Sequence, residues 1–469
     1  MTTIPQNTTL LKELVALLEA HRRVTRQQRV FARIVTLVLA EVLVLTRHTV
    51  TQLLITLGLT QRDWSPWYRL FSQGRFDIEH ANRVLLAETL HHVDSNAVYV
   101  IAGDSVQTAR SSSRIEGTGW LIHPQTPPFR PGIHTGQRWG HGCCLLPAEA
   151  NGYSRAVPLR WLPAFTEGAQ RQVTDACREW EATLEFASWV RAQLDHHGRQ
   201  HQPLLLLTDG GYDTLPLWQA LPDRVILLTR SAKNRVLHHL PAASSGERGR
   251  PRRYGERAPT PQEVWRSRAG WQSITLTVRG RTRHLQVKVS GPLLRRGAPH
   301  RPLFLLVVRG KSNARVRRDP LPFLVNAVQD AHGQWVLPLP LDTLLFWAWQ
   351  RWEIEVCHRE LKSNFGLGDK QCFNPRAAVL SVQWSAWVYA LLLLAAYRTW
   401  GLCGAPPVPT RWWRGAPRWS LNTLRRALRA ELWHITDFHP LYPATLADLR
   451  KNQHWLPALL NAVLGAAPS

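Results

Sequence analysis

The sequence predicts an α/β protein in which a mixed β-sheet is flanked by helices and both ends of the chain are helical. Three observations predict this class. Short apolar runs at residues 97–103, 203–208 and 224–230 have the composition of strands that are buried on both faces. A long helical pattern separates the first two of these runs, which is typical of an α/β layer. A basic stretch with strand-like alternation then precedes two more helical segments, which indicates a β-rich insertion ahead of the last core helices.

The N-terminal region is predicted to be helical. Residues 8–45 place their apolar side chains at helical spacing. Gly58 then separates two short helical patterns, and the second begins with Ser65 as its N-cap and Pro66 as its first residue. A helix, a glycine turn and a short helix that carries Arg69 together outline a helix-turn-helix, which would bind DNA. An ordinary helical hairpin has the same outline, so both interpretations stay open.

The next segment is predicted to form the first part of the core. Its first buried strand ends at Asp104, and its second is followed directly by Asp209. Open sheets bind their ligands at the carboxyl ends of their strands, so both acids are candidate site residues. The other elements expected here are strands at Trp139–Leu146 and Arg155–Trp161 and a helix at roughly Gln170–Leu194.

The insertion is predicted to be a basic, β-rich module. Residues 230–318 hold 22 Lys and Arg but only three acids, and so account for most of the net charge of +25. Residues 272–294 alternate apolar and polar side chains around Gly280, as a β-hairpin does, and Phe304–Val308 is a further strand. Residues 244–261 have the composition of a disordered basic loop. Because so many like charges repel one another, contact with phosphates is favoured over a merely solvated face.

A single helix is predicted from Leu341 to Lys362, with Asp342 as its cap. At 3.6 residues per turn, one face of this helix carries four charged residues, namely Arg351, Glu355, Arg359 and Lys362. Such a face is either a solvated ladder of ion pairs or an acid aimed at a metal beside a polyanion. Three nearby tryptophans, Trp347, Trp349 and Trp352, favour the second interpretation, because a solvated face rarely carries so much aromatic surface.

The segment Ala377–Tyr397 is apolar and has no formal charge over its 21 residues. We interpret it as a buried helix rather than a membrane span, since polar residues such as Gln383 dilute it and no second span accompanies it. A proline-rich linker follows, and Ser420 is expected to cap a helix that runs to Trp433. The expected organisation is a helical N-terminal domain at 1–95, a core at 96–231 and 339–400, an insertion at 232–338 and a helical region at 401–469.

Composition narrows the class of partner. The 469 residues are enough for two or three domains with a substantial core. The sequence has 58 Lys and Arg against 33 Asp and Glu, and most of the cations are arginine. The planar guanidinium group of arginine can donate two hydrogen bonds to phosphate oxygens, so a nucleic acid is the favoured partner. A high-GC genome would explain Arg over Lys but not the excess over acids. Six cysteines without metal-site spacing indicate a reduced, cytoplasmic protein, and the N-terminus has no signal-peptide pattern.

The three acids Asp104, Asp209 and Glu355 form the candidate catalytic set. Two-metal phosphoryl transfer uses carboxylates to hold two Mg²⁺ ions about 4 Å apart, one beside the attacking oxygen and one beside the leaving oxygen. Mg²⁺ prefers hard oxygen ligands and keeps positions open for water and phosphate. Each aspartate alone could equally be a turn or cap residue, and Asp213 is a rival for Asp209.

The sequence resembles the RNase H-like DDE transposases of bacterial insertion sequences, in the IS-four-like branch with a YREK signature. That signature is Tyr, two residues, Arg, three residues, Glu, six residues and Lys, and RWEIEVCHRELK places Arg351, Glu355 and Lys362 in register. The strands that end in Asp104 and Asp209 are similar to the two Asp strands of the family. The resemblance covers roughly residues 97–397.

The resemblance implies an RNase H-like sheet, dependence on Mg²⁺ (with Mn²⁺ as an alternative), and strand cleavage and transfer at terminal inverted repeats. It implies that Asp104, Asp209 and Glu355 are metal ligands and that Arg351 and Lys362 bind DNA phosphates. Arg359 and Arg69 are further candidate DNA-binding residues from their positions in the sequence. Double-stranded DNA and a second copy of the chain are the implied partners, in the bacterial cytoplasm and without a membrane.

One position departs from the signature, because Ala348 stands where the family has its tyrosine. Trp347 and Trp349 lie about 100° away on the helix, so neither replaces it simply. The family's tyrosine helps to hold the 5′ phosphate and a hairpin intermediate, so the route of donor cleavage stays open.

A catalytically inactive DNA-binding protein that descends from such an element is the alternative function, and a membrane protein is a weaker one.

Overall fold

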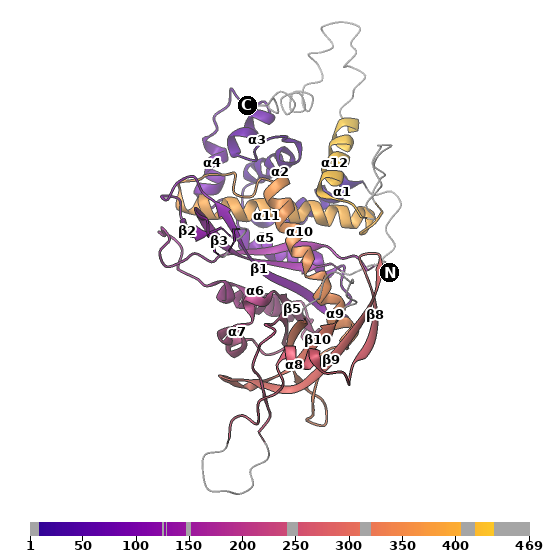
Figure 1. The fold of residues 1–469 in the computed structure, drawn as a ribbon. Coiled ribbons are helices and arrows are strands. Elements are labelled where there is room, and N and C mark those ends of the chain that lie inside the picture. Colours follow the sequence, from indigo (N-terminus) through magenta and orange to yellow (C-terminus); the bar gives the residue numbers. More distant parts are fainter. Residues whose placement is uncertain are drawn as a thin grey trace.

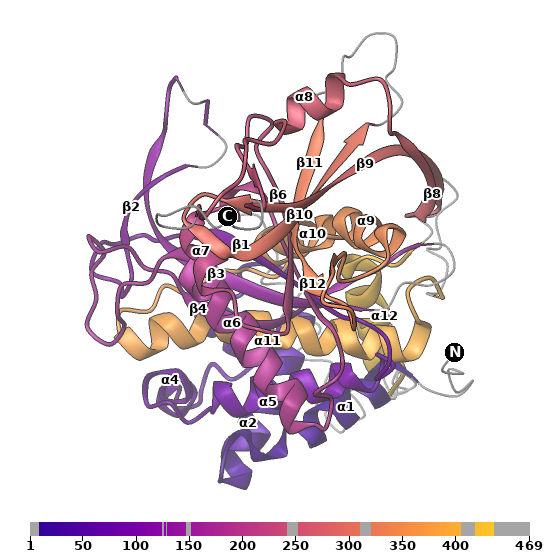
Figure 2. The ribbon, with the colours of Figure 1, turned by 90° about the horizontal axis from the view of Figure 1, so that it is seen from below.

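The structure is a computed structural model of the chain (Figures 1 and 2). It describes residues 9–123, 126–127, 129–146, 152–241, 252–309, 320–404 and 418–435. Residues 244–251 of the expected basic loop at 244–261, nearly all of the proline-rich linker and most of the 401–469 region lie outside the described residues.

A single mixed sheet runs through the molecule. Its strand order is β2-β3-β1-β5-β6-β11-β10-β9-β7, with β4 paired to β3 and β8 paired to β9. The strands of the first half are β1 (Tyr99–Ala109), β2 (Gly119–Ile122), β3 (Ile133–Leu145), β4 (Ala156–Pro163), β5 (Leu204–Thr208) and β6 (Val225–Arg230). β1 is antiparallel to β3 and parallel to β5, and β5 is parallel to β6. The predicted class, an RNase H-like mixed sheet flanked by helices, is confirmed.

The central strands are buried on both faces, as their apolar runs predict. Every residue of β5 is buried, and so are Tyr99 to Gly103 at the start of β1. One face is covered by α6 (Glu179–His196), which approaches so closely that glycine is needed on the strands below it. A Cβ atom at Gly140 would lie 2.6 Å from Cβ of Ala182, and one at Gly142 would lie 2.4 Å from the ring of Phe186.

The insertion extends the same sheet, because β11 pairs with β6. Its elements are β7 (His238–His239), α8 (Pro261–Arg266), β8 (Gln272–Val278), β9 (Arg281–Arg295), β10 (Ala298–Arg309) and β11 (Leu321–Asn326). The predicted hairpin is confirmed: β8 and β9 pair antiparallel, and Arg279 and Gly280 between them have φ of 54° and 68°. Two positive φ values in a two-residue loop match the twist of a β-hairpin. A small separate sheet joins β12 (Val328–Gln329) to β13 (Trp335–Val336).

Helices from both ends of the chain cover the other side (Figure 1). The N-terminal ones are α1 (Leu10–Ala20), η1 (Arg22–Val24), α2 (Gln28–Leu43), α3 (Val50–Thr56), α4 (Ser65–Ser72) and α5 (Ile78–Leu90). They pack around α11 (Pro375–Trp400), which lies almost parallel to the sheet layer in Figure 2. Among the described helices α11 alone is long and apolar enough to cross a membrane, and 89% of its most apolar stretch is buried inside the protein. That burial is typical of a core helix.

The predicted helix at Leu341–Lys362 is in fact two, α9 (Leu341–Gln350) and α10 (Trp352–Asn364). The turn between them is tighter than an α-turn, since Ile354 N donates to Arg351 O, only three residues back, at 3.0 Å. Asp342 does not cap α9, because Pro340 occupies the N-cap and an Asp342 carboxylate oxygen accepts from the next residue, Thr343 N, at 2.7 Å.

Other predicted boundaries were also wrong: β3 begins at Ile133, six residues before the predicted Trp139. The N-cap of α4 is Trp64 rather than Ser65, whose N–H donates to Asp63 at 2.9 Å. α6 begins at Glu179, nine residues after Gln170. β1 does not end at Asp104 but continues to Ala109, because β3 pairs with it along that whole stretch. The predicted cap at Ser420 is confirmed: Thr423 N donates to its hydroxyl at 3.2 Å, at the start of α12 (Leu421–Ile435).

Candidate active site

Asp104 and Asp209 lie side by side on neighbouring parallel strands. β1 and β5 are paired from Tyr99 with Leu204 to Ala102 with Leu207. The same offset, carried two residues further, places Asp104 next to Asp209, directly after the end of β5. Asp209 also caps the short η2 turn (Gly210–Tyr212), where Gly211 N donates to its Oδ1 at 2.9 Å. Thus the turn role and the site role of this residue are compatible.

Glu355 faces the same place from α10, and one arginine lies between it and Asp104. Arg351 Nη2 contacts Glu355 Oε1 at 2.5 Å, and its Nη1 lies 3.6 Å from Asp104 Oδ2. The Nη1 atom is buried and makes no hydrogen bond, because its distance to Asp104 is too long for one. The tight turn at the junction of α9 and α10 therefore puts a guanidinium between two of the three predicted carboxylates.

The electrostatics of the site favour a hard cation. Burial and, next to it, the negative charge of Asp209 raise the pKa of Asp104 to about 7; Glu355 contributes in the same direction, whereas Arg351 opposes the change. Neighbouring carboxylates raise one another's pKa because their negative charges repel. Such a group of carboxylates is typical of a site where bound cations neutralise the charges. As the side chains stand in the described part of the chain, no group of three His, Cys, Asp or Glu residues is arranged tightly enough to hold a metal. Arg351 occupies part of that space.

Asp213, the rival for Asp209, is a structural residue. Its side chain is fully buried. Its Oδ2 contacts Arg235 Nη2 at 2.6 Å, and its Oδ1 contacts Arg295 Nη1 at 2.6 Å. The hydroxyl of Ser231 and the indole N–H of Trp218 also donate to it, at 2.6 and 3.0 Å. Both carboxylate oxygens are thereby committed, while no described cation pairs with Asp209. The two acids thus divide into one that can accept a new ligand and one that cannot.

A histidine pair next to Asp104 was not among the predicted site residues. His141 lies opposite Asp104 in the β1–β3 register, and its Nδ1 is 2.7 Å from Nε2 of His358 on α10. Burial lowers the pKa of both rings, to about 3 for His358, so the pair is neutral at pH 7. The contact ties α10 to β3 one helical turn from Glu355. A histidine three residues after Glu355 was the only local signal, and its partner lies 217 positions away.

Buried ion pairs hold α10 on its other face. Glu353 is fully buried and contacts Arg279 at 2.7 Å and Arg418 at 2.6 Å. Glu360 is also buried; it contacts Arg155 and accepts from the hydroxyl of Tyr389 at 2.6 Å. Removing one member would leave a buried charge unpaired, so these contacts fix the rotation of α10 about its axis. Glu355 is thereby kept toward the strands.

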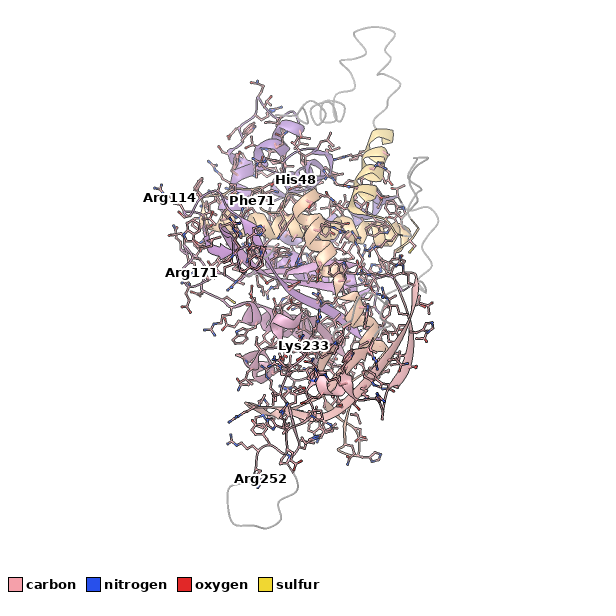
Figure 3. All side chains as sticks on the ribbon, viewed as in Figure 1. His48, Phe71, Arg114, Arg171, Lys233 and Arg252 are labelled. Atoms are coloured by element: carbon pink, nitrogen blue, oxygen red, sulfur yellow. The ribbon has the colours of Figure 1, made fainter. Side chains whose placement is uncertain are left out.

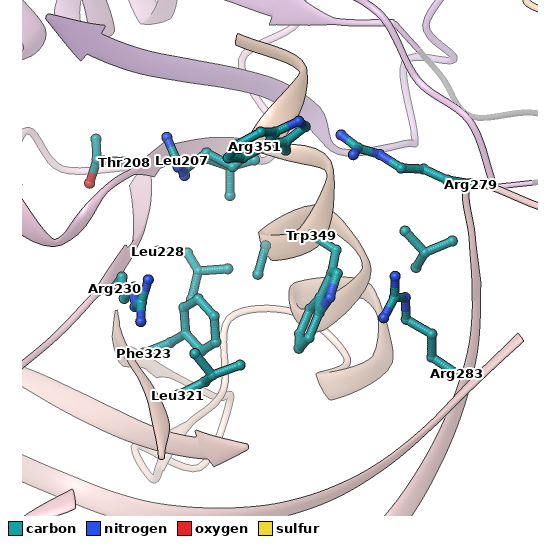
Figure 4. A pocket seen from close by; sticks show the side chains of 13 residues that line it. Leu207, Thr208, Leu228, Arg230, Arg279, Arg283, Leu321, Phe323, Trp349 and Arg351 are labelled. Atoms are coloured by element: carbon teal, nitrogen blue, oxygen red, sulfur yellow. The ribbon is translucent and has the colours of Figure 1, made fainter. Parts of the chain in front are cut away.

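A cationic cavity of about 310 Å³ adjoins Arg351 (Figure 4). Arg230, Arg279 and Arg283 line it together with Arg351, and no acid does. The aromatic side chains of Phe323, Trp349 and Trp352 form much of the remaining wall, and so does Ala348, which stands at the signature's tyrosine position. Guanidinium groups and rings in one cavity fit a group that is both anionic and planar, as a nucleotide is.

The other predicted DNA-binding residues lie in two different places. Lys362 is on α10 near Asp104; desolvation lowers the pKa of its ammonium, while Asp104 opposes the change. Arg359 is exposed on the same helix. Arg69 is exposed on α4, which is separated from α10 in both views of the fold (Figures 1 and 2). The structure therefore brings Arg351 and Lys362 to the acids but not Arg69.

A family model described as DDE superfamily endonuclease matches residues 17–289, which include Asp104 and Asp209 and end before α10. No curated protein matches the chain.

Proposed function

Because the chain belongs to the DDE superfamily of endonucleases, we propose that it is the transposase of a bacterial insertion sequence. It would cut DNA strands at the terminal inverted repeats of the element and join the freed 3′ ends to target DNA. The observation that carries this proposal is the convergence of Asp104, Asp209 and Glu355, whose mutual repulsion contributes to raising the pKa of Asp104 to about 7.

The three carboxylates would hold two Mg²⁺ ions, with Mn²⁺ as an alternative. Bound there, such ions supply activation of the attacking oxygen and stabilisation of the leaving oxygen. The chain's own groups do the rest. Lys362 and, once it is displaced from the acids, Arg351 would bind the phosphates beside the cut. Arg230 and Arg283, the cavity arginines without an acid partner among the described residues, would hold the neighbouring nucleotide, and the histidine pair would keep Glu355 directed at the strands.

The remaining regions would supply recognition and assembly. Helices α3 and α4, with Arg69 exposed, are the candidate reader of the inverted repeats, and the basic insertion at 232–338 would bind the DNA backbone. Two copies of the chain would act on the two ends of the element. The expected place of action is the bacterial cytoplasm, where the nucleoid lies.

Strand cleavage in solution tests this proposal. A supercoiled plasmid that carries the gene with its flanking genomic DNA is incubated with the protein and Mg²⁺, and nicks are mapped by primer extension. We expect nicks at the ends of an inverted repeat from the wild type, and none from Asp209→Asn or Glu355→Gln. Asp223→Asn is the matched control, because that side chain is 97% exposed, and it should cut normally. Equal nicking by Asp209→Asn would overturn the proposal.

A DNA-binding protein without catalysis is the second candidate. Two observations favour it: Ala348 replaces the signature tyrosine, and the Arg351 guanidinium already neutralises two of the acids. If the wild type and Asp209→Asn bind the repeat equally and neither cuts it with Mg²⁺ or Mn²⁺, this candidate is the correct one.

A further inference from the structure

A β-hairpin arm at the edge of the sheet exposes apolar side chains. The arm consists of β2 and the first residues of β3, and Figure 2 shows it standing away from the body of the molecule. Trp120 is 74% exposed, Ile122 is 65% exposed and Ile133 is 66% exposed, whereas Leu121 between the first two is buried. Large apolar side chains that are exposed together in this way usually mark a binding surface.

The three exposed side chains share one face of the arm. In the β2–β3 register Ile122 is directly opposite Ile133, and Trp120 is opposite Thr135. Residues that are opposite one another, or two apart on one strand, point to the same side of a sheet. Trp120, Ile122 and Ile133 therefore form a continuous apolar face, which we call the arm face.

The arm face is on the same side of the sheet as Asp104. Counting along β3 in steps of two leads from Ile133 to His141, and His141 is opposite Asp104 in the β1–β3 register. The pairing of β1 with β3 is continuous from Ala109 to Ile101, so the alternation is not interrupted. Gln137 and Trp139 between them on this face are fully buried, so DNA that contacted both the carboxylates and the arm would pass over the groups that cover these two side chains.

The base of the arm is joined to the site. Arg110, directly after β1, donates to the carbonyl oxygens of Gly368 and Lys370 in the loop that follows α10, at 3.0 and 3.1 Å. On the arm itself, burial lowers the pKa of His134, and its neighbours His123 and Lys362 act in the same direction. The hydrogen bonds of Arg110 tie the base of the arm to the loop that follows α10.

The surroundings of the arm face are positively charged. Between residues 110 and 135 the only acid is Glu116, and its side chain is already occupied by the backbone N–H groups of Gln172, Val173 and Thr174. Arg114 and Arg130 of the same segment are exposed, and Arg114 and Arg171 project from the edge of the molecule beside β2 (Figure 3). The loop that carries Arg171 also exposes Glu167 and Asp175, so the positive charge that complements a polyanion is that of Arg114 and Arg130 on the arm segment itself.

We propose that the arm face contacts double-stranded DNA beside the carboxylates, through sugars and bases, while the surrounding arginines bind phosphates. Two-stranded ribbons fit a DNA groove, and apolar side chains can pack between base steps. A second copy of the chain fits less well. Three side chains supply only a fraction of the roughly 800 Å² that each partner buries in a stable protein interface, and two positively charged rims would repel. The proposal rests on the proposed function only in taking DNA as the substrate.

Binding without metal tests it. The affinity for a short fluorescent duplex from the end of the element is measured by anisotropy in EDTA over a series of salt concentrations. We expect Trp120→Ala/Ile122→Ala to lower the affinity at least about five-fold, as loss of aromatic stacking does. The slope of log affinity against log salt should not change, because no phosphate contact is lost. Arg130→Ala should instead reduce that slope by about one.

Val328→Ala is the matched control, since Val328 is a half-exposed β-branched residue on the separate β12–β13 sheet, and it should bind as the wild type does. Melting curves check that each variant is folded. Wild-type affinity in Trp120→Ala/Ile122→Ala would overturn the proposal. So would a wild type that is dimeric without DNA, by light scattering, and becomes monomeric in that variant, because a second copy would then cover the face. A wild type that binds no DNA would overturn both this inference and the proposed function. A wild type that binds DNA but does not cut it would overturn the proposed function alone, and the binding measurements would still test the arm face.

Discussion

Acidic side chains occur in two kinds of environment in this protein, fully buried and partly buried, and the two kinds differ in how completely their charge is matched. Asp213, Glu353 and Glu41 are each fully buried, and each contacts at least one described cation within 3 Å. At the candidate site Asp104 and Glu355 share one guanidinium, that of Arg351, and Asp209 has no cation partner among the described residues. Fully paired acids hold elements of the fold together. Underpaired acids are retained at a cost in stability, so the difference indicates where a ligand is needed.

The largest expected effect separates two aspartates that lie four residues apart. Asp213→Asn should destabilise the fold by about 3–5 kcal/mol, because Arg235 and Arg295 would lose their partner in a buried place. Asp209→Asn should change stability by less than about 1 kcal/mol, since the amide oxygen can still cap Gly211 and repulsion with Asp104 is relieved. Urea unfolding followed by circular dichroism measures both. Equal losses would mean that Asp209 is structural too.

The second effect concerns the pH dependence of a matched acid. Burial alone would raise the pKa of Glu41, but Lys370 and His48 bring it down to about 2, well below its ordinary value of 4.5. A lowered pKa in the folded state stabilises the protein above pH 4.5, and this contribution is lost as the pH falls toward 2. It is worth roughly 3 kcal/mol. Glu41→Gln should be less stable than the wild type at neutral pH, with a difference that shrinks in acid. A constant difference would contradict the assignment.

The third prediction tests the underpaired site directly. Arg351→Gln should bind Mn²⁺ roughly ten-fold more tightly than the wild type in the absence of DNA, because a cation no longer competes for Asp104 and Glu355. Electron paramagnetic resonance of free Mn²⁺ measures this affinity without reference to cleavage. Arg359→Gln, exposed on the same helix, is the control and should bind as the wild type does. Identical affinities in all three proteins would show that Arg351 does not occupy the place of the ions.

The smallest expected effect is that of a single surface cation. Lys362→Ala should weaken DNA binding by about 1 kcal/mol or less and reduce the slope of log affinity against log salt by about one. Lys12→Ala, exposed on α1, is the comparison and should leave the slope unchanged. A Lys362 variant with the wild-type slope would mean that its ammonium serves the carboxylates and not a phosphate.

Local patterns in the sequence predicted which strands and helices exist better than they predicted the residues at which those strands and helices end. The hairpin around Gly280 and the buried strands before Asp104 and Asp209 follow from alternation and composition, and the structure confirms them. The continuation of β1 beyond Asp104 depends on pairing with β3, a contact between distant segments that periodicity does not contain. The break at Arg351 likewise depends on one three-residue hydrogen bond within an otherwise helical pattern.

The site was predictable only where residues carry a motif. The spacing of Arg351, Glu355 and Lys362 pointed to α10, although the family match ends at residue 289, so the place of Glu355 beside the aspartates comes from the structure alone. The choice of Asp209 over Asp213 needed the arginines at 235 and 295, which are far away in the sequence. The roles of these residues in catalysis and metal binding stay predictions until the variants are measured.

The unbroken pairing of β3 with β1 and β2 also fixes a length. Ile133 is eight residues from His141, which lies opposite Asp104, and extended chain rises about 3.3 Å per residue, so roughly 26 Å separates them. B-form DNA advances about 3.4 Å per step, so DNA that contacted both places, above the buried middle of the strand, would span about eight base pairs between them. The place of the cut relative to the end of the element would then be set by the number of residues in a strand, and an insertion of two residues there would move it.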